Sequence, residues 1–336
     1  MKKYLPFLLL SLFIGCGTAE KYSEYYEIPK EMSNPESHQK ILDTYSPYLK
    51  GVKIFIDPGH GGTERGARSS VIEAELNLRV ALALRGFLEE AGAIVTMSRT
   101  ADSTVGLVTR SDEANQSGCD MFISVHHNAP GGKDNQINYT STYYHAMESD
   151  YEFNPCNKDI AKYVQRDISY ATRNSGGPGS FDGTYSDYSI YPKKGFSVLR
   201  LTNLPSVLVE ASFVTSRLEQ KRLANETYNR IEAWGIFKGL SRYFSQGIPT
   251  IEQLSGNTIN KNEIIVFKLY DKSGIDPNSI KTFIDSTKIH FIFEPESNKL
   301  MIPTERFNSG EHELNIIIAN KNGNHSFPFR KNFIIK

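Results

Sequence analysis

The stretch that decides the fold is Val52-Lys53-Ile54-Phe55-Ile56-Asp57-Pro58-Gly59-His60-Gly61-Gly62. Its first five residues are mostly apolar and β-branched or aromatic, a pattern that predicts a short β-strand. Proline and glycine then end the strand, because proline has no amide hydrogen to donate and glycine favours turns. His60 is therefore expected on a glycine-rich loop at the carboxyl end of a strand.

Helices and strands alternate after this point. Apolar residues recur at helical spacing over 73–91 and Gly92 follows as a stop signal, so we expect an amphipathic helix with Glu73 in its first turn. The other expected elements are strands at 93–98, 121–125 and 206–210 and helices at 104–117, 157–172 and 227–244. This order predicts an α/β fold with a parallel or mixed sheet.

Three of the expected strands lead into residues that can bind a metal ion or a proton. These residues are His60, His126 and Glu210, and Glu73 begins the helix after the first strand. In open α/β sheets the carboxyl ends of the strands are where ligands bind. Two imidazoles and one carboxylate suit a hydrolytic zinc ion whose fourth position stays open for water. The remaining acidic group, Glu210, would then be free to act as a general base.

Five segments resemble the zinc-dependent N-acetylmuramoyl-L-alanine amidases, in the order of that family and with similar gaps. They are residues 56–62 (IDPGHGG), 73–78 (EAELNL), 110–115 (RSDEAN), 124–128 (SVHHN) and 204–210 (LPSVLVE). The resemblance implies a twisted mixed sheet with helices on both faces and one Zn²⁺ per catalytic domain. It places the metal ligands on His60, Glu73 and His126, rather than on Glu75, and the catalytic glutamate on Glu210.

The resemblance also implies a function, that of a peptidoglycan hydrolase. Such an amidase cleaves the amide between the lactyl group of N-acetylmuramic acid and the L-alanine of the stem peptide, with zinc-activated water and a glutamate as general base. Two alternatives stay open, a zinc peptidase that cuts within the stem peptide and a non-catalytic lipoprotein that binds the cell wall. The products of digestion distinguish the amidase from the peptidase. A missing metal ligand or base would indicate the non-catalytic lipoprotein.

Three further residues within these segments are candidates for supporting the metal ligands or contacting the substrate. Asp57 has two open interpretations, since it could orient His60 as a hydrogen-bond acceptor or only shape the turn. His127 is expected to point away from His126, because successive side chains of a strand face opposite sides. Asn128 follows both histidines and belongs to the same group of candidates.

The N-terminus resembles an export signal. Two lysines precede an apolar run of about 12 residues, whereas a membrane-spanning helix needs about 20. The run ends in Leu12-Phe13-Ile14-Gly15-Cys16, which resembles a bacterial lipobox, although cleavage after 17–19 is the alternative. We expect 1–16 to be a lipoprotein signal peptide that ends at the lipidated Cys16, followed over 17–50 by a polar tether that carries one short helix.

These features predict an exported protein of the cell envelope, lipid-anchored on the periplasmic side, with the outer membrane favoured. Lys and Arg together number 38, as do Asp and Glu, so the chain lacks the positive charge that nucleic-acid binding requires. The expected partners are therefore peptidoglycan and, through the lipid, a membrane.

The composition changes near the end of the expected catalytic domain, which spans 51–246. Residues 251–336 contain one alanine and fifteen isoleucines, a shift from helix formers to β-branched residues that predicts an all-β region. Strands are expected at 263–270, 281–285, 289–293, 299–302, 313–319 and 329–335. We expect a linker at 247–262 and a β-sandwich at 263–336 that resembles bacterial immunoglobulin-like domains, with a protein or the cell wall as its partner.

Overall fold

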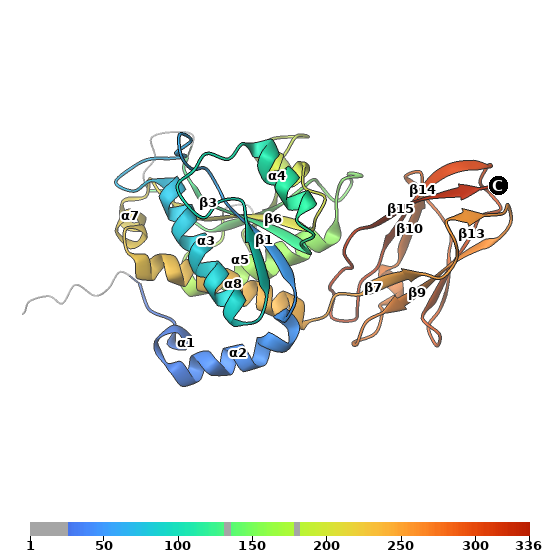
Figure 1. Ribbon diagram of the computed structural model, residues 1–336, viewed down its shortest axis with the longest axis horizontal. Coiled ribbons are helices and arrows are strands. Elements are labelled where there is room, and N and C mark those ends of the chain that lie inside the picture. The colour runs from blue at the N-terminus through green and yellow to red at the C-terminus, as the bar shows by residue number, and fades with distance from the viewer. Residues whose placement is uncertain (1–25, 131–135, 178–181) are drawn as a thin grey trace, which may run out of the picture.

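The computed structural model describes residues 26–130, 136–177 and 182–336, which form an α/β body followed by an all-β body (Figure 1). The strands of the first body are β1 (Lys53–Pro58), β2 (Ile94–Met97), β3 (Met121–Asn128), β4 (Ser141–Tyr144), β5 (Thr184–Ser186) and β6 (Ser206–Phe213). They form one sheet in the order β2-β1-β3-β6-β4-β5. The first four of these are parallel and β4 is antiparallel to β6, so the sheet is mixed.

Helices cover both faces of this sheet. They are α3 (Glu73–Glu90), α4 (Leu107–Gln116), α5 (Pro155–Thr172), α6 (Ser197–Arg200), α7 (Arg217–Leu223) and α8 (Glu226–Ser245), with a short 3-10 helix at Asp187–Ser189. Ile54 and Ile56 of β1 pack with α3, α5 and α8, whereas Phe55 packs with α4 and α6 on the other face. Successive side chains of a strand face opposite sides, so one apolar run supplies both cores. The expected α/β fold class is confirmed.

Residues 30–49 of the expected tether are helical and pack on the α/β body. This segment forms α1 (Lys30–Ser33) and α2 (Pro35–Leu49), and residues 17–25 lie outside the described residues. The side chain of Asn34 accepts a hydrogen bond from the amide of Ser37, a local cap that begins α2. Leu42 and Leu49 are buried in the core, and Figure 1 shows α2 lying along the α/β body. The polar composition of the segment concealed these two anchors.

Replacing Leu49 by alanine tests whether α2 is part of the fold. Leu49 is fully buried, so Leu49→Ala is expected to lower the free energy of unfolding by about 2–5 kcal/mol, because it leaves a cavity. Lys40→Ala, at an exposed position of the same helix, is the control and should change it by less than about 0.5 kcal/mol. Chemical denaturation monitored by circular dichroism measures both. Equal denaturation midpoints for the two variants would show that α2 does not contribute to the stability of the fold.

The second body is a sandwich of two β-sheets. Its strands are β7 (Thr250–Gln253), β8 (Thr258–Ile259), β9 (Ile264–Tyr270), β10 (Lys281–Ile284), β11 (Thr287–Lys288), β12 (Ile292–Glu294), β13 (Lys299–Pro303), β14 (Gly310–Ile317) and β15 (Phe329–Ile335), with a 3-10 helix at Pro277–Ser279. The sheets have the orders β11-β10-β14-β15-β8 and β12-β13-β9-β7. Phe267, Leu300 and Phe333 lie in their shared core. The all-β region is confirmed, and its likeness to an immunoglobulin domain stays a prediction.

The expected linker at 247–262 is part of this sandwich. Within it, β7 pairs with β9 and β8 pairs with β15. Both strands are short, with alternate residues exposed, so their sequences carry little of the apolar pattern that marks a strand. Few residues therefore separate α8 from the first strand of the second body. Within the described residues, none of the helices has both the length and the apolar character needed to cross a membrane.

Candidate metal centre

The structure brings His60, Glu73 and His126 together. His60 follows β1, Glu73 is the first residue of α3, and His126 lies in β3. One donor atom from each side chain lies within 4.8 Å of the other two. Glu73 Oε1 is 3.1 Å from His60 Nε2 and 3.0 Å from His126 Nδ1. Two imidazoles and one carboxylate are ligands that zinc accepts, so this donor set fits the metal that the sequence predicts.

Two glycines lie so close to these side chains that no larger residue would fit in their place. A Cβ atom at Gly59 would lie 2.1 Å from His126 Nε2, and one at Gly66 would lie 2.4 Å from Glu73 Oε2. His60 itself has φ 59°, in the left-handed region that non-glycine residues seldom adopt. Strain of this kind persists where the surrounding structure holds it, and it is common at functional sites.

Two buried arginines hold the loop that carries His60. Arg110 donates from Nη2 to the carbonyl oxygen of His60 (2.7 Å) and from Nη1 to that of Pro58 (2.8 Å). Arg99, which the sequence analysis did not single out, donates to the carbonyl oxygens of Pro58 and Gly59 at 2.9 Å. The carbonyl oxygens of the loop thus accept hydrogen bonds from charged guanidinium groups, and hydrogen bonds with a charged donor are among the stronger kinds.

Asp57 acts on this loop through Arg110. Its carboxylate is fully buried and accepts hydrogen bonds from Arg110 Nη1 (2.5 Å), Ser98 Oγ (2.6 Å) and Ser124 Oγ (2.8 Å). These are the side-chain hydrogen bonds that the structure gives Asp57, and His60 is not among them. Of the two interpretations left open by the sequence, this geometry favours shaping of the turn.

The Glu73 carboxylate is held in its charged form. Its Oε2 accepts a hydrogen bond from the amide of Ala67 (2.8 Å), and the side chain is almost completely buried. Burial alone would raise its pKa, but hydrogen bonds from His126 and His60 outweigh burial and hold the pKa of Glu73 far below its usual value. A carboxylate that stays ionised is ready to bind a cation.

Glu210 lies beside these ligands with an unpartnered carboxylate oxygen. It is paired with His126 across the neighbouring strands β3 and β6. Its Oε2 is buried and has no hydrogen-bond partner among the described residues. Burial, reinforced by the charge of Glu73, raises the pKa of Glu210 well above its usual value. An unpaired buried carboxyl group is costly, so its presence beside a metal site indicates a function rather than a stabilising role.

Both strands extend further than the sequence predicts. β3 continues to Asn128 and β6 to Phe213, and the pairing shifts register between His126 and Asn128. Such an irregularity re-aims side chains and is common beside active sites. It escapes sequence analysis because no single residue marks it.

His127 and Asn128 have different surroundings. The His127 side chain is fully buried, with Nδ1 2.8 Å from Asn77 Oδ1 and Nε2 3.2 Å from Glu232 Oε1. It therefore points away from His126, as the strand geometry predicts, and its ring is fully enclosed by protein. Asn77 also contacts Glu73 Oε1 at 3.4 Å, so this buried network supports a metal ligand from behind. Asn128 lines the cavity in front of the site.

The side chains of the metal centre line one cavity of about 800 Å³, namely His60, Glu73, His126 and Glu210. Its walls include the start of α4 at Gly106 and Leu107 and a segment from Tyr191 to Val198. The sequence analysis did not single out Glu64, whose Oε1 lies 3.7 Å from His60 Nδ1 and which also lines the cavity.

Cys119 and Cys156 are both buried and unpaired, and Cys16 lies outside the described residues.

A mixed α/β sheet that presents a two-histidine, one-carboxylate cluster beside an unpaired glutamate fits the class of hydrolases that use a metal ion. Comparison with known proteins is more specific. Residues 54–242, more than half of the chain, match the family described as N-acetylmuramoyl-L-alanine amidase. The chain belongs to this family, and it is an amidase of peptidoglycan.

Individual relatives agree with this assignment. The chain is 35% identical to the N-acetylmuramoyl-L-alanine amidase CwlM of Bacillus licheniformis over 58% of its own length and 69% of that protein. It is 30% identical to the sporulation-specific amidase of Bacillus subtilis over 65% and 76% of the two chains. An amidase structure from Clostridium difficile 630 superposes with a TM-score of 0.51 at 30% identity, covering 59% of this chain and 99% of that one. In all three the shared region leaves a large part of this chain unmatched.

Proposed function

We propose that the amidase is zinc-dependent, with His60, Glu73 and His126 as ligands and Glu210 as general base. The observation that carries this proposal is the convergence of three donor atoms within 4.8 Å next to a buried carboxylate oxygen without a partner. Bound zinc would polarise the scissile carbonyl and lower the pKa of a water molecule to about 7. The protein supplies the donors, the base and a cavity that admits the substrate.

Glu210 moves the proton in this reaction. Its Oε2, which has no partner among the described residues, accepts a proton from the attacking water. The same group then donates that proton to the amine of L-alanine as the amide bond breaks. Burial and the charge of Glu73 raise the pKa of Glu210, and a higher pKa makes its carboxylate a stronger base than a fully solvated glutamate.

Digestion of intact peptidoglycan tests the reaction and its metal together. The purified full chain is incubated with peptidoglycan, first metal-free and then with one equivalent of zinc, and the released material is analysed by mass spectrometry. We expect zinc-dependent release of intact stem peptides that begin with L-alanine. Peptides cut internally would support the alternative zinc peptidase, and a protein that binds peptidoglycan but releases nothing would support the non-catalytic alternative.

We also propose that the protein is exported to the cell envelope and anchored there by lipid on Cys16, on the periplasmic side and with the outer membrane favoured. The lipobox-like sequence that ends at Cys16 and the peptidoglycan substrate both support this location. Replacing the thiol removes the site of acylation, so Cys16→Ser is expected to move the protein from the membrane fraction to the soluble fraction. Metabolic labelling with a fatty acid measures the same change, and labelling of Cys16→Ser at the wild-type level would rule the anchor out.

A further inference from the structure

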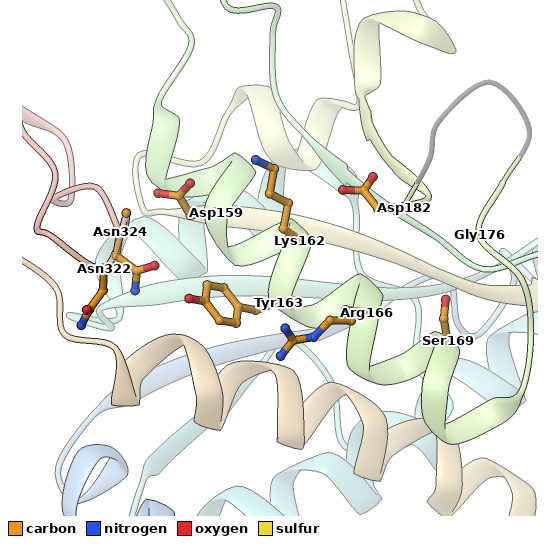
Figure 2. Close-up of a pocket in the computed structure, with 10 residues that line it drawn as sticks. Asp159, Lys162, Tyr163, Arg166, Ser169, Gly176, Asp182, Asn322 and Asn324 are labelled. Atoms are coloured by element: carbon orange, nitrogen blue, oxygen red, sulfur yellow. The ribbon is translucent and has the colours of Figure 1, made fainter. Parts of the chain in front are cut away.

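A second cavity lies where the two bodies meet, and it contains none of the residues of the metal centre. Its volume is about 570 Å³, and Figure 2 shows the side chains that line it. One wall is a polar stripe of α5 that runs from Asp159 to Ser169, and another is the turn Asn322–Asn324 of the all-β body. Ligand sites of this size occur preferentially at domain interfaces.

Hydrogen bonds between the two bodies fix the shape of this cavity. The amide and Nδ1 of His325 both contact Asp159 Oδ2, at 2.9 and 2.7 Å. The Asn324 side chain donates to the carbonyl oxygens of Tyr243 and Gly247 at 3.0 Å. The turn is thereby tied to α5 and to the end of α8, so a ligand would meet a preformed site and lose less free energy to ordering it.

The charges that line the cavity are balanced. Asp159 and Asp182 are acidic, and Lys162 and Arg166 are basic. Within the described residues, Lys162 Nζ has no hydrogen-bond or ion-pair partner, and Figure 2 shows it extending from α5 between the two aspartates. A lining of this kind gives no preference for a highly charged polymer, because each sign of charge is opposed by the other.

The remaining groups suit a polyhydroxylated ligand. Tyr163 projects from α5 toward Asn322 and Asn324 in Figure 2, and its ring is only half-buried. An aromatic ring packs against the C–H groups of a sugar, while amide, carboxylate and ammonium groups exchange hydrogen bonds with its hydroxyls. Aromatic and polar groups on one wall therefore match a saccharide better than an apolar or an ionic ligand.

One segment of chain lines both this cavity and the cavity of the metal centre. Gly176 and Asp182 line the interdomain cavity, and the chain then forms β5, which pairs with β4. The same segment continues to Tyr191 and Phe196, which line the metal centre. The chain from Asp182 to Phe196 therefore contributes to the walls of both cavities.

We propose that the interdomain cavity is a second binding site, which holds the glycan strand of peptidoglycan away from the bond that is cut. The proposal rests on peptidoglycan being the substrate. It assigns the all-β body a role in recognition, because the turn Asn322–Asn324 completes the site.

Calorimetric titration tests the proposal. The probe is an oligosaccharide of N-acetylglucosamine, which mimics the sugar backbone of the glycan strand without free lactyl carboxylates, titrated into the metal-free full chain. Lys162→Ala and Tyr163→Ala are each expected to weaken binding about tenfold or more, since each removes a direct contact. Lys40→Ala, an exposed helical lysine far from the cavity in sequence, is the matched control and should bind as the wild type does.

Each outcome decides the proposal. Tyr163 also packs against the ring of Tyr243, so thermal melting is measured first, and Lys162→Ala keeps the test valid if Tyr163→Ala unfolds. Absence of glycan binding, or binding that both variants leave unchanged, overturns the site. If the wild type still releases stem peptides with zinc, that result refutes only the second site. Failure of release with glycan binding intact would instead refute the proposed zinc reaction.

Discussion

Glu210→Gln is expected to lower turnover on peptidoglycan by about 10²- to 10⁴-fold, the range typical for loss of a general acid–base group. Glutamine has the shape of glutamate but cannot accept and return a proton, so the substitution removes one chemical capacity and little volume. Because Glu210 is not one of the three clustered ligands, the variant should still bind one equivalent of zinc. Turnover is measured as release of stem peptides, and zinc content by elemental analysis.

A matched control keeps this result specific. Glu113 is an exposed glutamate on α4, and Glu113→Gln removes the same charge without touching the cavity. It should retain wild-type turnover within a factor of two or so, as surface substitutions do. A Glu210→Gln protein that turns over at the rate of the Glu113→Gln control would exclude Glu210 as the base.

Glu210→Gln, although it lowers turnover, should raise the stability of the metal-free protein. Burial and the charge of Glu73 raise the pKa of Glu210 in the folded state, so the unfolded chain releases this proton at lower pH. Between the ordinary carboxyl pKa and the raised one, the folded state therefore binds more protons than the unfolded state, and stability falls as pH rises. Glutamine removes that loss, so metal-free Glu210→Gln should melt at a higher temperature than the metal-free wild type at pH 7.

The elements around the metal centre are predictable because local pattern and tertiary role agree there. The apolar run of β1 and the helical periodicity of α3 are long enough to identify, and each is followed or headed by a ligand. Glycine at position 59 reflects the close approach of His126, which a side chain would prevent. The glycine of the IDPGHGG motif is therefore a local sequence signal of a contact between distant segments.

What the sequence did not predict depends on contacts between distant segments. Arg99 supports the His60 loop from the end of another strand, and Glu232 reaches His127 from α8. Neither has a local signal, since each is an isolated polar residue in its own segment. The strand β4 was missed for a different reason: its four residues, Ser-Thr-Tyr-Tyr, are all buried and show no alternation. Burial on both faces removes the period that marks a strand.

The accessory regions show the same limit. α2 is polar along most of its length, and only Leu42 and Leu49 of this helix are buried, so composition alone favoured a tether. The interdomain cavity needs α5 and a turn about 160 residues later to be brought together, which no motif encodes. Composition indicated the class of each body, and the contacts between the bodies came only from the structure.

His126→Ala is expected to abolish both zinc binding and turnover. The substitution removes one of three donors, and even loss of a group that only orients a ligand costs about 10- to 100-fold in metal affinity, so loss of the ligand itself should exceed that range. It also removes a hydrogen bond that holds Glu73 charged, so the pKa of Glu73 should rise and the remaining pair should bind a cation less well. Zinc affinity is measured by competition with a chromogenic chelator.

The comparison of His126→Ala with Glu210→Gln separates the two roles in the site. Both variants should lose turnover, but only His126→Ala should lose the metal, and added zinc should restore little of its activity. His290→Ala replaces an exposed histidine in the all-β body and controls for loss of an imidazole elsewhere. A His126→Ala protein that holds stoichiometric zinc as tightly as this control would move the metal away from the His60–Glu73–His126 cluster. Loss of zinc in both His126→Ala and Glu210→Gln would instead make Glu210 a fourth ligand and leave the reaction without an assigned base.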